Sequence, residues 1–287
     1  MRTLGQLFVS SRPLSWINTA FPFAAAYLLT TGRIDAAFVI GTVYFLIPYN
    51  LAMYGINDVF DYESDLRNPR KGGVEGALLD PSIHRTMLWA AAITNVPFLI
   101  ALVILGSPLS WLMLAISIFA VIAYSAKGLR FKERPVLDSI TSATHFLSPA
   151  VYGLVLAHAA FTPALALILV SFFLWGMASH AFGAVQDVIA DREGGLDSIA
   201  TIFGARVTTR LAVAAYALAG LLLLGTEWPG PLALLAAVPY IAITARFWMI
   251  TDATAETAHR GWKLFLLLNF VAGAIVTLLM IYWATNR

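Results

Sequence analysis

Long apolar runs dominate this chain, and shorter polar segments separate them. Nine runs are long enough to be helices that cross a bilayer, because the hydrocarbon core of a membrane requires about 20 apolar helical residues. Their approximate bounds are 15–31, 36–55, 86–105, 108–124, 139–158, 162–182, 208–225, 230–250 and 262–283. The runs are continuously apolar rather than alternating, which argues against a membrane β-barrel. The pattern therefore predicts an all-α, polytopic membrane protein with nine transmembrane helices.

The breaks between the runs are of two kinds, and these kinds alternate along the chain. One kind is a short turn that contains Gly or Pro, as in "TTGRID", "LGSPLS", "HAAFTP" and "TEWPGP". The other kind is a longer polar segment, at 56–85, 125–138, 183–207 and 251–261. If there are nine helices, every long segment lies on the same side of the membrane as the N-terminus, and every short turn lies on the opposite side.

Composition agrees with a membrane location, and the distribution of charge predicts the orientation of the chain across the membrane. Only 12% of the 287 residues are charged, whereas soluble domains average about 25%. Of the 18 Arg and Lys residues, all but Arg33 and Arg287 fall on the side of the long segments. Because positive residues accumulate in cytoplasmic loops, we expect a cell-membrane protein whose N-terminus and long segments are cytoplasmic. The sequence has no cysteine, which excludes disulfides and thiolate ligands.

The first long segment carries regularly spaced acids within "NDVFDYESDLRNPRKGG" (57–73). The second apolar helix can continue into this stretch, because no helix breaker precedes Asn68-Pro69. On such a helix Asn57, Asp61 and Asp65 lie on one face, since four residues make slightly more than one turn. Asp58 lies one residue around the helix from Asn57.

A shorter version, "QDVIADREGG" (186–195), follows the sixth helix and repeats the spacing with Asp187 and Asp191. Carboxylate and amide oxygens are ligands for Mg²⁺, which usually takes one or two carboxylates and leaves positions for phosphate oxygens. A single acidic loop is more often only solvated charge. Two clusters with the same spacing on the same side instead predict a Mg²⁺ site for a diphosphate.

Basic residues accompany the acids on this side. The segment "YSAKGLRFKERP" follows the fourth helix, and further bases flank the first cluster. Arg and Lys bind phosphate oxygens, although the bias of cytoplasmic loops toward positive charge would place bases here anyway. The candidate diphosphate-binding residues are Asp58, Arg67, Tyr124, Ser125, Lys127 and Arg130.

Aromatic residues make up 13% of the sequence, and several lie within the predicted spans, including Tyr44, Phe45, Tyr49 and Tyr152. Many aromatic residues of membrane proteins simply face lipid or the interface. Any that line a cavity could stabilise a cation through their π faces.

The paired motifs, the Tyr124-Ser125 basic loop and the nine predicted helices resemble the UbiA superfamily of intramembrane prenyltransferases. The resemblance extends over the whole chain and implies one domain, 1–287, with its helices bundled around a central cavity. It implies that Asn57, Asp61, Asp65, Asp187 and Asp191 bind Mg²⁺ and the diphosphate of an isoprenoid donor. Asp61, Asp187 and Asp191 would carry the catalytic role.

Within the superfamily, "NDVFDYESDLRNPRKGGVEG" is similar to the lycopene elongases of C50 carotenoid biosynthesis. This similarity implies that dimethylallyl diphosphate is the donor and that the end of a linear carotenoid such as lycopene is the acceptor. Ionisation of the donor gives an allylic cation, which the acceptor captures within the membrane.

Three other functions compete with this interpretation. A prenyltransferase for an aromatic acceptor, such as a quinone or haem precursor, would share the same site. A secondary transporter would carry charged residues near the bilayer midplane, whereas the centres of these spans are nearly free of charge. A CDP-alcohol phosphotransferase would have one longer Asp motif instead of two separated ones.

Overall fold

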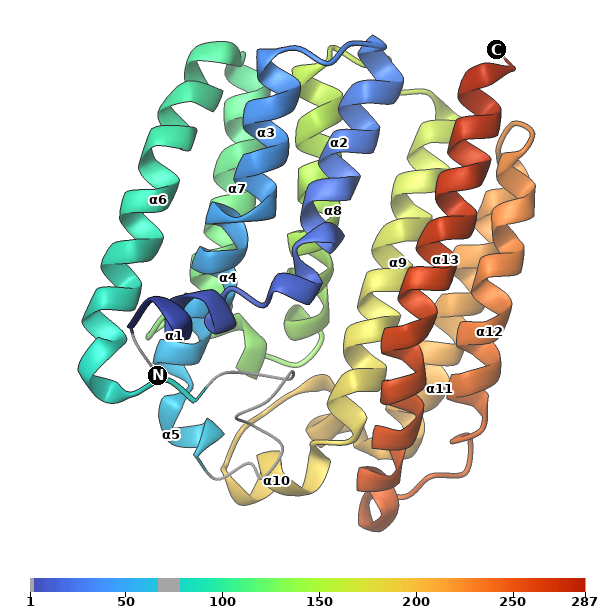
Figure 1. The fold of residues 1–287 in the computed structure, drawn as a ribbon. Coiled ribbons are helices and arrows are strands. Elements are labelled where there is room, and N and C mark those ends of the chain that lie inside the picture. Colours follow the sequence, from blue (N-terminus) through green and yellow to red (C-terminus); the bar gives the residue numbers. More distant parts are fainter. Residues whose placement is uncertain (1–2, 67–77, 287) are drawn as a thin grey trace. The chain divides into compact units, whose positions relative to one another are not determined.

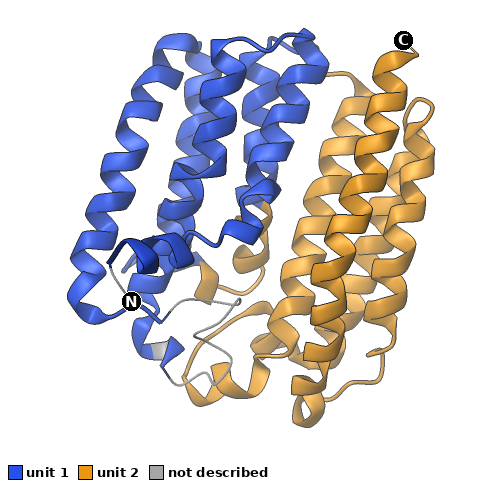
Figure 2. Cartoon of the chain, viewed as in Figure 1, with its two compact units in different colours: residues 1–131, 144–159 blue, residues 132–143, 160–287 orange. Residues whose placement is uncertain are grey.

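The computed structural model of this chain describes residues 3–66 and 78–286, and all elements of these residues are helical. The chain divides into two compact units, which Figure 2 draws in different colours. Unit 1 consists of residues 1–131 and 144–159, and unit 2 consists of residues 132–143 and 160–287. Each unit has a buried apolar core of its own.

Unit 1 contains the N-terminal helices, coloured blue to green in Figure 1. They are α1 (Thr3–Ser10), α2 (Ile17–Thr31), α3 (Ala36–Leu46), α4 (Pro48–Phe60), α5 (Tyr62–Asp65), α6 (His84–Leu105), α7 (Pro108–Ser125) and the larger part of α8 (Leu137–Leu156). The predicted second span is thus two helices, α3 and α4. The break falls at Pro48, because proline has no N–H with which to continue the helical hydrogen bonds.

Unit 2 contains the first residues of α8 and all the later helices. The later helices are α9 (Pro163–Val185), α10 (Val188–Glu193), α11 (Ile199–Leu222), α12 (Leu234–Ala245) and α13 (His259–Thr285). Short 3₁₀ turns in the two units are Pro13–Ser15, Pro81–Ile83, Phe131–Glu133, Leu223–Gly225, Gly230–Ala233 and Asp252–Ala258. Helices α9 and α11 are joined by interhelical hydrogen bonds of the kind that membrane helices use. The Ser171 hydroxyl donates to the Ala219 carbonyl at 2.6 Å, for example.

Six helical segments of the described residues are long and apolar enough to cross a membrane. They are Ala36–Phe60, Pro81–Leu105, Pro108–Ser125, Pro163–Val185, Ile199–Gly225 and Asp252–Thr285. The prediction of nine spans is therefore not confirmed, although each predicted run falls on a helix. Helix α12 has only 12 residues, a length of about 18 Å against a hydrocarbon core of about 30 Å.

Apolar side chains cover the exposed faces of the long helices. Ile104 of α6 is 77% exposed and Leu267 of α13 is 65% exposed, and both helices bury only a small part of their most apolar stretch. A soluble protein rarely leaves so large an apolar surface in water. Helices whose backbone groups are satisfied internally can instead face lipid, so these surfaces indicate a protein with several membrane-spanning helices.

The aromatic residues of the predicted spans form the centre of unit 1. Tyr44, Phe45, Tyr49 and Tyr152 have no exposed surface, and neither has Phe23. Their rings pack at ordinary aromatic distances, with centroids 4.9 Å apart for Tyr44 and Phe45 and 5.2 Å apart for Phe45 and Tyr49. These rings therefore contact one another as core residues of unit 1.

The contact between α2 and α3 leads to a stability prediction. A Cβ atom on Gly41 would collide with the ring of Phe23, which its aromatic neighbours hold in place. We expect Gly41→Ala to destabilise the protein by about 1–3 kcal/mol through overpacking, measured as a lower melting temperature in detergent. Gly273→Ala on α13 is the matched control, because no heavy atom lies within 4 Å of its added Cβ. Equal melting temperatures for the two variants would contradict this packing.

Candidate functional site

The first predicted cluster begins at the end of α4, and the prediction that Asn57 and Asp61 share one face is confirmed. The Asn57 side-chain amide Nδ2 donates to Asp61 Oδ2 at 2.6 Å, so these two side chains share one face. Helix α4 ends at Phe60 instead of continuing toward Asn68. The i to i−4 backbone bonds nevertheless continue, from Asp61 N to Asn57 O at 2.9 Å and from Asp65 N to Asp61 O at 2.8 Å. Asp61 and Asp65 are both buried.

The end of α7 joins this cluster. Ser125 is buried, and its hydroxyl oxygen accepts the second hydrogen of Asn57 Nδ2 at 2.9 Å. Because Nδ2 gives its hydrogens to Asp61 and Ser125, Oδ1 is the atom that Asn57 can offer to a cation. The adjacent Tyr124 packs edge-on against His145, with ring centroids 5.3 Å apart.

The basic segment after α7 turns back toward α4. Arg130 Nη2 lies 3.8 Å from Asp61 Oδ1, and Arg130 Nη1 donates to the Phe60 carbonyl at 3.4 Å. Gly128 supplies the positive φ of 92° that this turn requires. Lys127 is exposed, and Arg67 lies outside the described residues. Among the predicted bases, Arg130 is thus directly beside an acid of the first cluster.

Asp58 points in another direction. Its side chain is fully buried, and its oxygens accept hydrogen bonds from Ser10 Oγ at 2.7 Å and from Arg12 Nη2 at 2.9 Å. Asp58 was predicted to bind diphosphate, but these contacts are with the N-terminal segment. The sequence gives no sign of them, because 46 residues separate Arg12 from Asp58.

The second predicted cluster belongs to unit 2 and begins where α9 ends. Asp187 is the N-cap residue of α10, and the Asp191 N–H donates to the Asp187 carbonyl at 2.8 Å. Both side chains are partly buried. Helix α10 ends at Glu193, and Gly195 has a positive φ of 68°. The glycines thus follow the short helix α10, whereas the long helix α9 already ends at Val185.

A buried acid from α8 holds the segment that follows the second cluster. Asp138 has no exposed surface, and its oxygens accept from the backbone N–H groups of Ser139 at 2.6 Å and of Ile199 at 2.7 Å. Ile199 is the first residue of α11, and Ser198 with Thr201 forms a capping box there. The loop between α10 and α11 is therefore tied to α8.

Charged and polar contacts from later elements hold the same region. Arg192 Nη1 donates to Asp252 Oδ2 at 2.7 Å, and Asp252 Oδ1 accepts from the Ala205 N–H at 2.7 Å. This carboxylate lies against the kink at Gly204, whose φ is 79°. On the other side of the cluster, His259 Nδ1 donates to the side chain of Gln186 at 2.7 Å. The residues flanking Asp187 and Asp191 are thus fixed from several elements of unit 2.

The donor atoms of both clusters suit Mg²⁺. The described residues contain no group of three or more acidic or histidine side chains placed to hold one metal ion. Mg²⁺, however, usually binds through one or two carboxylates and completes its shell with water and phosphate oxygens. The carboxylates of Asp61 and Asp65 with the Asn57 amide, or those of Asp187 and Asp191, fit that requirement.

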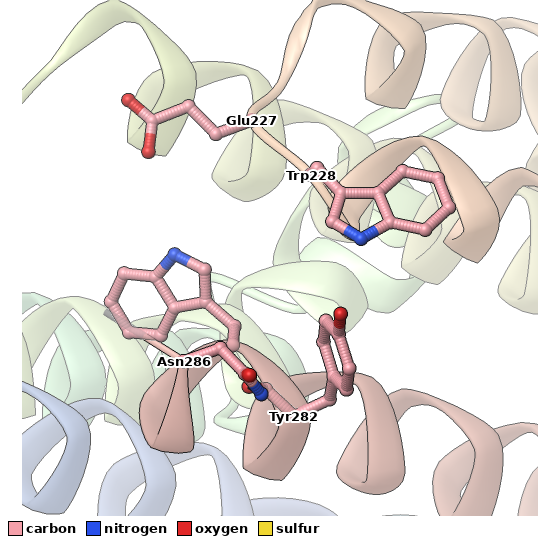
Figure 3. Close-up of a pocket in the computed structure, with 5 residues that line it drawn as sticks. Glu227, Trp228, Tyr282 and Asn286 are labelled. Atoms are coloured by element: carbon pink, nitrogen blue, oxygen red, sulfur yellow. The ribbon is translucent and has the colours of Figure 1, made fainter.

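A pocket of about 320 Å³ occurs elsewhere in unit 2, and no predicted site residue lines it. Figure 3 shows the turn residues Glu227 and Trp228 facing Tyr282 and Asn286 from the end of α13; Trp283 also lines the pocket. Trp and Tyr are enriched where helices leave a membrane, so this lining is typical of an interfacial surface.

Sequence comparisons identify relatives of the whole chain. A model of the UbiA prenyltransferase family matches residues 19–272. The lycopene elongase/hydratase of Corynebacterium glutamicum is 56% identical over 281 residues, which are 98% of each chain. The C(50) beta-cyclic carotenoids biosynthesis protein LbtBC of Dietzia sp. (strain CQ4) is 58% identical over 280 residues, which cover 97% of this chain and 65% of that protein.

Solved structures with the same fold come from more distant relatives. A UbiA homolog from Archaeoglobus fulgidus bound to GPP and Mg²⁺ has a TM-score of 0.70 at 19% identity, covering 93% of this chain and 99% of that chain. The homolog bound to DMAPP and Mg²⁺ has a TM-score of 0.69 at 20% identity, covering 93% and 98%. At these identities the comparison establishes the fold.

The contact between Asp138 and the start of α11 is testable without an activity assay. Asp138→Ala leaves two buried N–H donors without their acceptor, at about 1–3 kcal/mol each. We expect a lower melting temperature in detergent and faster hydrogen exchange over residues 199–201. Asp197→Ala, at an exposed position of the same loop, should change neither quantity. Unchanged melting of Asp138→Ala would show that this carboxylate does not hold the loop.

Proposed function

Because this chain belongs to the UbiA prenyltransferase family, we propose that it transfers the dimethylallyl group of dimethylallyl diphosphate to the ends of a linear carotenoid such as lycopene. The observation that carries this proposal is the 56% identity to a lycopene elongase/hydratase along 98% of both chains. The chain is a prenyltransferase in a membrane, and the proposal adds its donor and its acceptor.

Both acidic clusters have proposed roles. Asn57, Asp61 and Asp65 of unit 1 would bind Mg²⁺, and so would Asp187 and Asp191 of unit 2, as their oxygen donors allow. When bound, Mg²⁺ supplies positive charge that neutralises the diphosphate oxygens as the donor ionises. Support for Mg²⁺ and this donor comes from the Archaeoglobus fulgidus homolog, which was solved with DMAPP and Mg²⁺.

The residues around the first cluster have distinct tasks in this proposal. Asn57 orients the Asp61 carboxylate through its 2.6 Å hydrogen bond, while Ser125 holds the Asn57 amide in turn. Arg130 lies beside Asp61 and can bind a diphosphate oxygen with the same guanidinium group. Tyr124, Lys127 and Arg67 are further candidates for the diphosphate.

The chemistry requires one bond to break and one to form. The C–O bond of the donor breaks, the electron pair leaves with the diphosphate, and the allylic cation is attacked by a terminal double bond of the carotenoid. The new C–C bond leaves a tertiary cation on the acceptor. That cation is quenched by loss of a proton or by addition of water with release of a proton. An apolar environment protects the first cation from premature hydrolysis.

We also propose that the N-terminus and the long polar segments face the cytoplasm. Sixteen of the 18 Arg and Lys residues lie on that side of the predicted topology, which the positive-inside rule assigns to the cytoplasm. A water-soluble diphosphate donor would then enter from the cytoplasm, while the carotenoid enters from the membrane.

The function is tested with labelled dimethylallyl diphosphate and lycopene. Membrane vesicles that contain the protein should transfer label to lycopene in Mg²⁺ and give products with one or two added C5 units, detected by mass spectrometry. EDTA should stop the transfer and added Mg²⁺ should restore it. Sealed inside-out vesicles should accept external donor, whereas right-side-out vesicles should not.

Different outcomes of this assay overturn different parts of the proposal. Label in a quinone precursor but not in lycopene would assign an aromatic acceptor. Full activity in EDTA would exclude the Mg²⁺ site, and activity only in right-side-out vesicles would reverse the orientation.

Carboxylate substitutions test the two clusters separately. Asp61→Asn and Asp187→Asn keep the side-chain size but remove a negative charge that Mg²⁺ requires. We expect each variant to lose at least about 100-fold in turnover, a loss typical of removing a group that stabilises charge in a transition state. Glu63→Gln, an exposed acid beside the first cluster, should retain activity. Wild-type turnover in either Asp variant, at equal amounts of inserted protein, would remove that cluster from the site.

A further inference from the structure

The N-terminal segment of unit 1 binds directly to Asp58, the residue next to Asn57 of the first acidic cluster. In Figure 1, α1 lies crosswise beside α4, whereas the long helices of unit 1 run alongside one another. Ser10, the last residue of α1, and Arg12, just after it, both contact Asp58. The two Asp58 oxygens accept from Ser10 at 2.7 Å and from Arg12 at 2.9 Å. The carboxylate has no exposed surface, and the Arg12 side chain is 19% exposed. This is a nearly buried ion pair beside the proposed metal ligands.

Arg12 is held in place by more than its charge. Its guanidinium carbon lies 4.3 Å from the ring centre of Tyr54, a cation–π contact. Tyr54 precedes Asp58 by four residues, so both lie on one face of α4. The Arg12 backbone has φ of 51° and ψ of 71°, a left-handed conformation that is unfavourable for a residue with a Cβ. Such a conformation persists where surrounding contacts enforce it, and the contacts with Asp58 and Tyr54 do so here.

The final turn of α4 is therefore held from two directions. Successive helical residues are rotated by about 100°, so Asp58 faces the N-terminal segment while Asn57 faces α7. On that second face Asn57 bonds to Ser125 and Asp61. Rotation or fraying of the last turn would break both sets of contacts together.

We propose that Arg12 and Asp58 are positioning residues for prenyl transfer. By fixing the rotation of the last turn of α4, the pair directs Asn57 and Asp61 toward Mg²⁺ and the donor diphosphate. This inference rests on the proposed function and changes the role of Asp58, which would act through Asn57 and Asp61 instead of contacting diphosphate. Partners that orient metal ligands commonly influence metal affinity or activity by about 10–100-fold.

The first test replaces Arg12 and measures the Mg²⁺ requirement. Arg12→Met should raise the Mg²⁺ concentration for half-maximal prenyl transfer by about 10–100-fold, and Arg12→Lys should restore part of the loss. Arg12→Met combined with Asp58→Asn should be no worse than Arg12→Met alone, because each change breaks the same contact. Arg85→Met is the control, since Arg85 is exposed on α6, and it should behave as wild type.

The second test uses metal-free protein. Hydrogen exchange over residues 54–61 should be faster in Arg12→Met than in wild type or Arg85→Met, because the last turn of α4 loses one of its two supports. Ser10→Ala removes a hydrogen bond to Asp58 without changing charge. Ser10→Ala should also raise the Mg²⁺ requirement and the hydrogen-exchange rate, but by less than Arg12→Met. It replaces Arg12→Met in both tests if that variant does not fold.

The outcomes separate this inference from the proposed function. If wild-type protein transfers no label to lycopene, the proposed function fails whatever the Arg12 variants do. If wild type is active but Arg12→Met keeps its Mg²⁺ requirement and its exchange rates, only the positioning role fails. A lower melting temperature with an unchanged Mg²⁺ requirement would also overturn it, since the pair would then serve stability alone.

Discussion

A carboxylate buried at the end of an apolar helix must be stabilised by donors, because transfer of an unpaired charge out of water is prohibitively unfavourable. The acids of this chain satisfy that constraint in several ways. Asp58 accepts from Ser10 and an arginine, Asp61 accepts from Asn57, and Asp138 accepts from two backbone N–H groups. Asp58 and Asp138 also join segments that are distant in sequence. The same contacts that make the charges tolerable thus position the ends of the helices.

The two clusters meet this constraint differently. In unit 1, side chains hold other side chains: Ser125 holds Asn57, and Asn57 holds Asp61. In unit 2, Asp138 accepts from the backbone N–H of Ile199 at the start of α11, and Asp252 accepts from that of Ala205 at the Gly204 kink. In the first cluster, side-chain hydrogen bonds therefore fix how the side chains are oriented. Around the second cluster, side-chain contacts fix the path of the backbone.

Local features of the structure could be predicted from the sequence, and features that depend on tertiary contacts could not. The four-residue spacing of Asn57 and Asp61 is a helical property, and their hydrogen bond confirms it. Gly195 ends its helix because glycine accommodates positive φ. The Arg12 contact with Asp58 and the Asp138 contact with Ile199 instead span 46 and 61 residues. Sequence periodicity does not reveal such distant pairs. The positive-inside rule was already sufficient to explain an arginine at position 12, so nothing in the sequence indicated its contact with Asp58.

The number of membrane spans also could not be predicted from the apolar runs alone. Hydropathy measures how apolar a run is, but helix length also depends on where backbone hydrogen bonds stop. Helix α2 has only 15 residues, and α12 keeps only 12 residues of a longer apolar run. Polar residues at the helix ends can then form contacts. Asp61, the C-cap residue of α4, for example accepts a hydrogen bond from Asn57. For this fold, the interruptions of the apolar runs therefore carry more functional information than the runs themselves, because the polar contacts that organise the clusters form there.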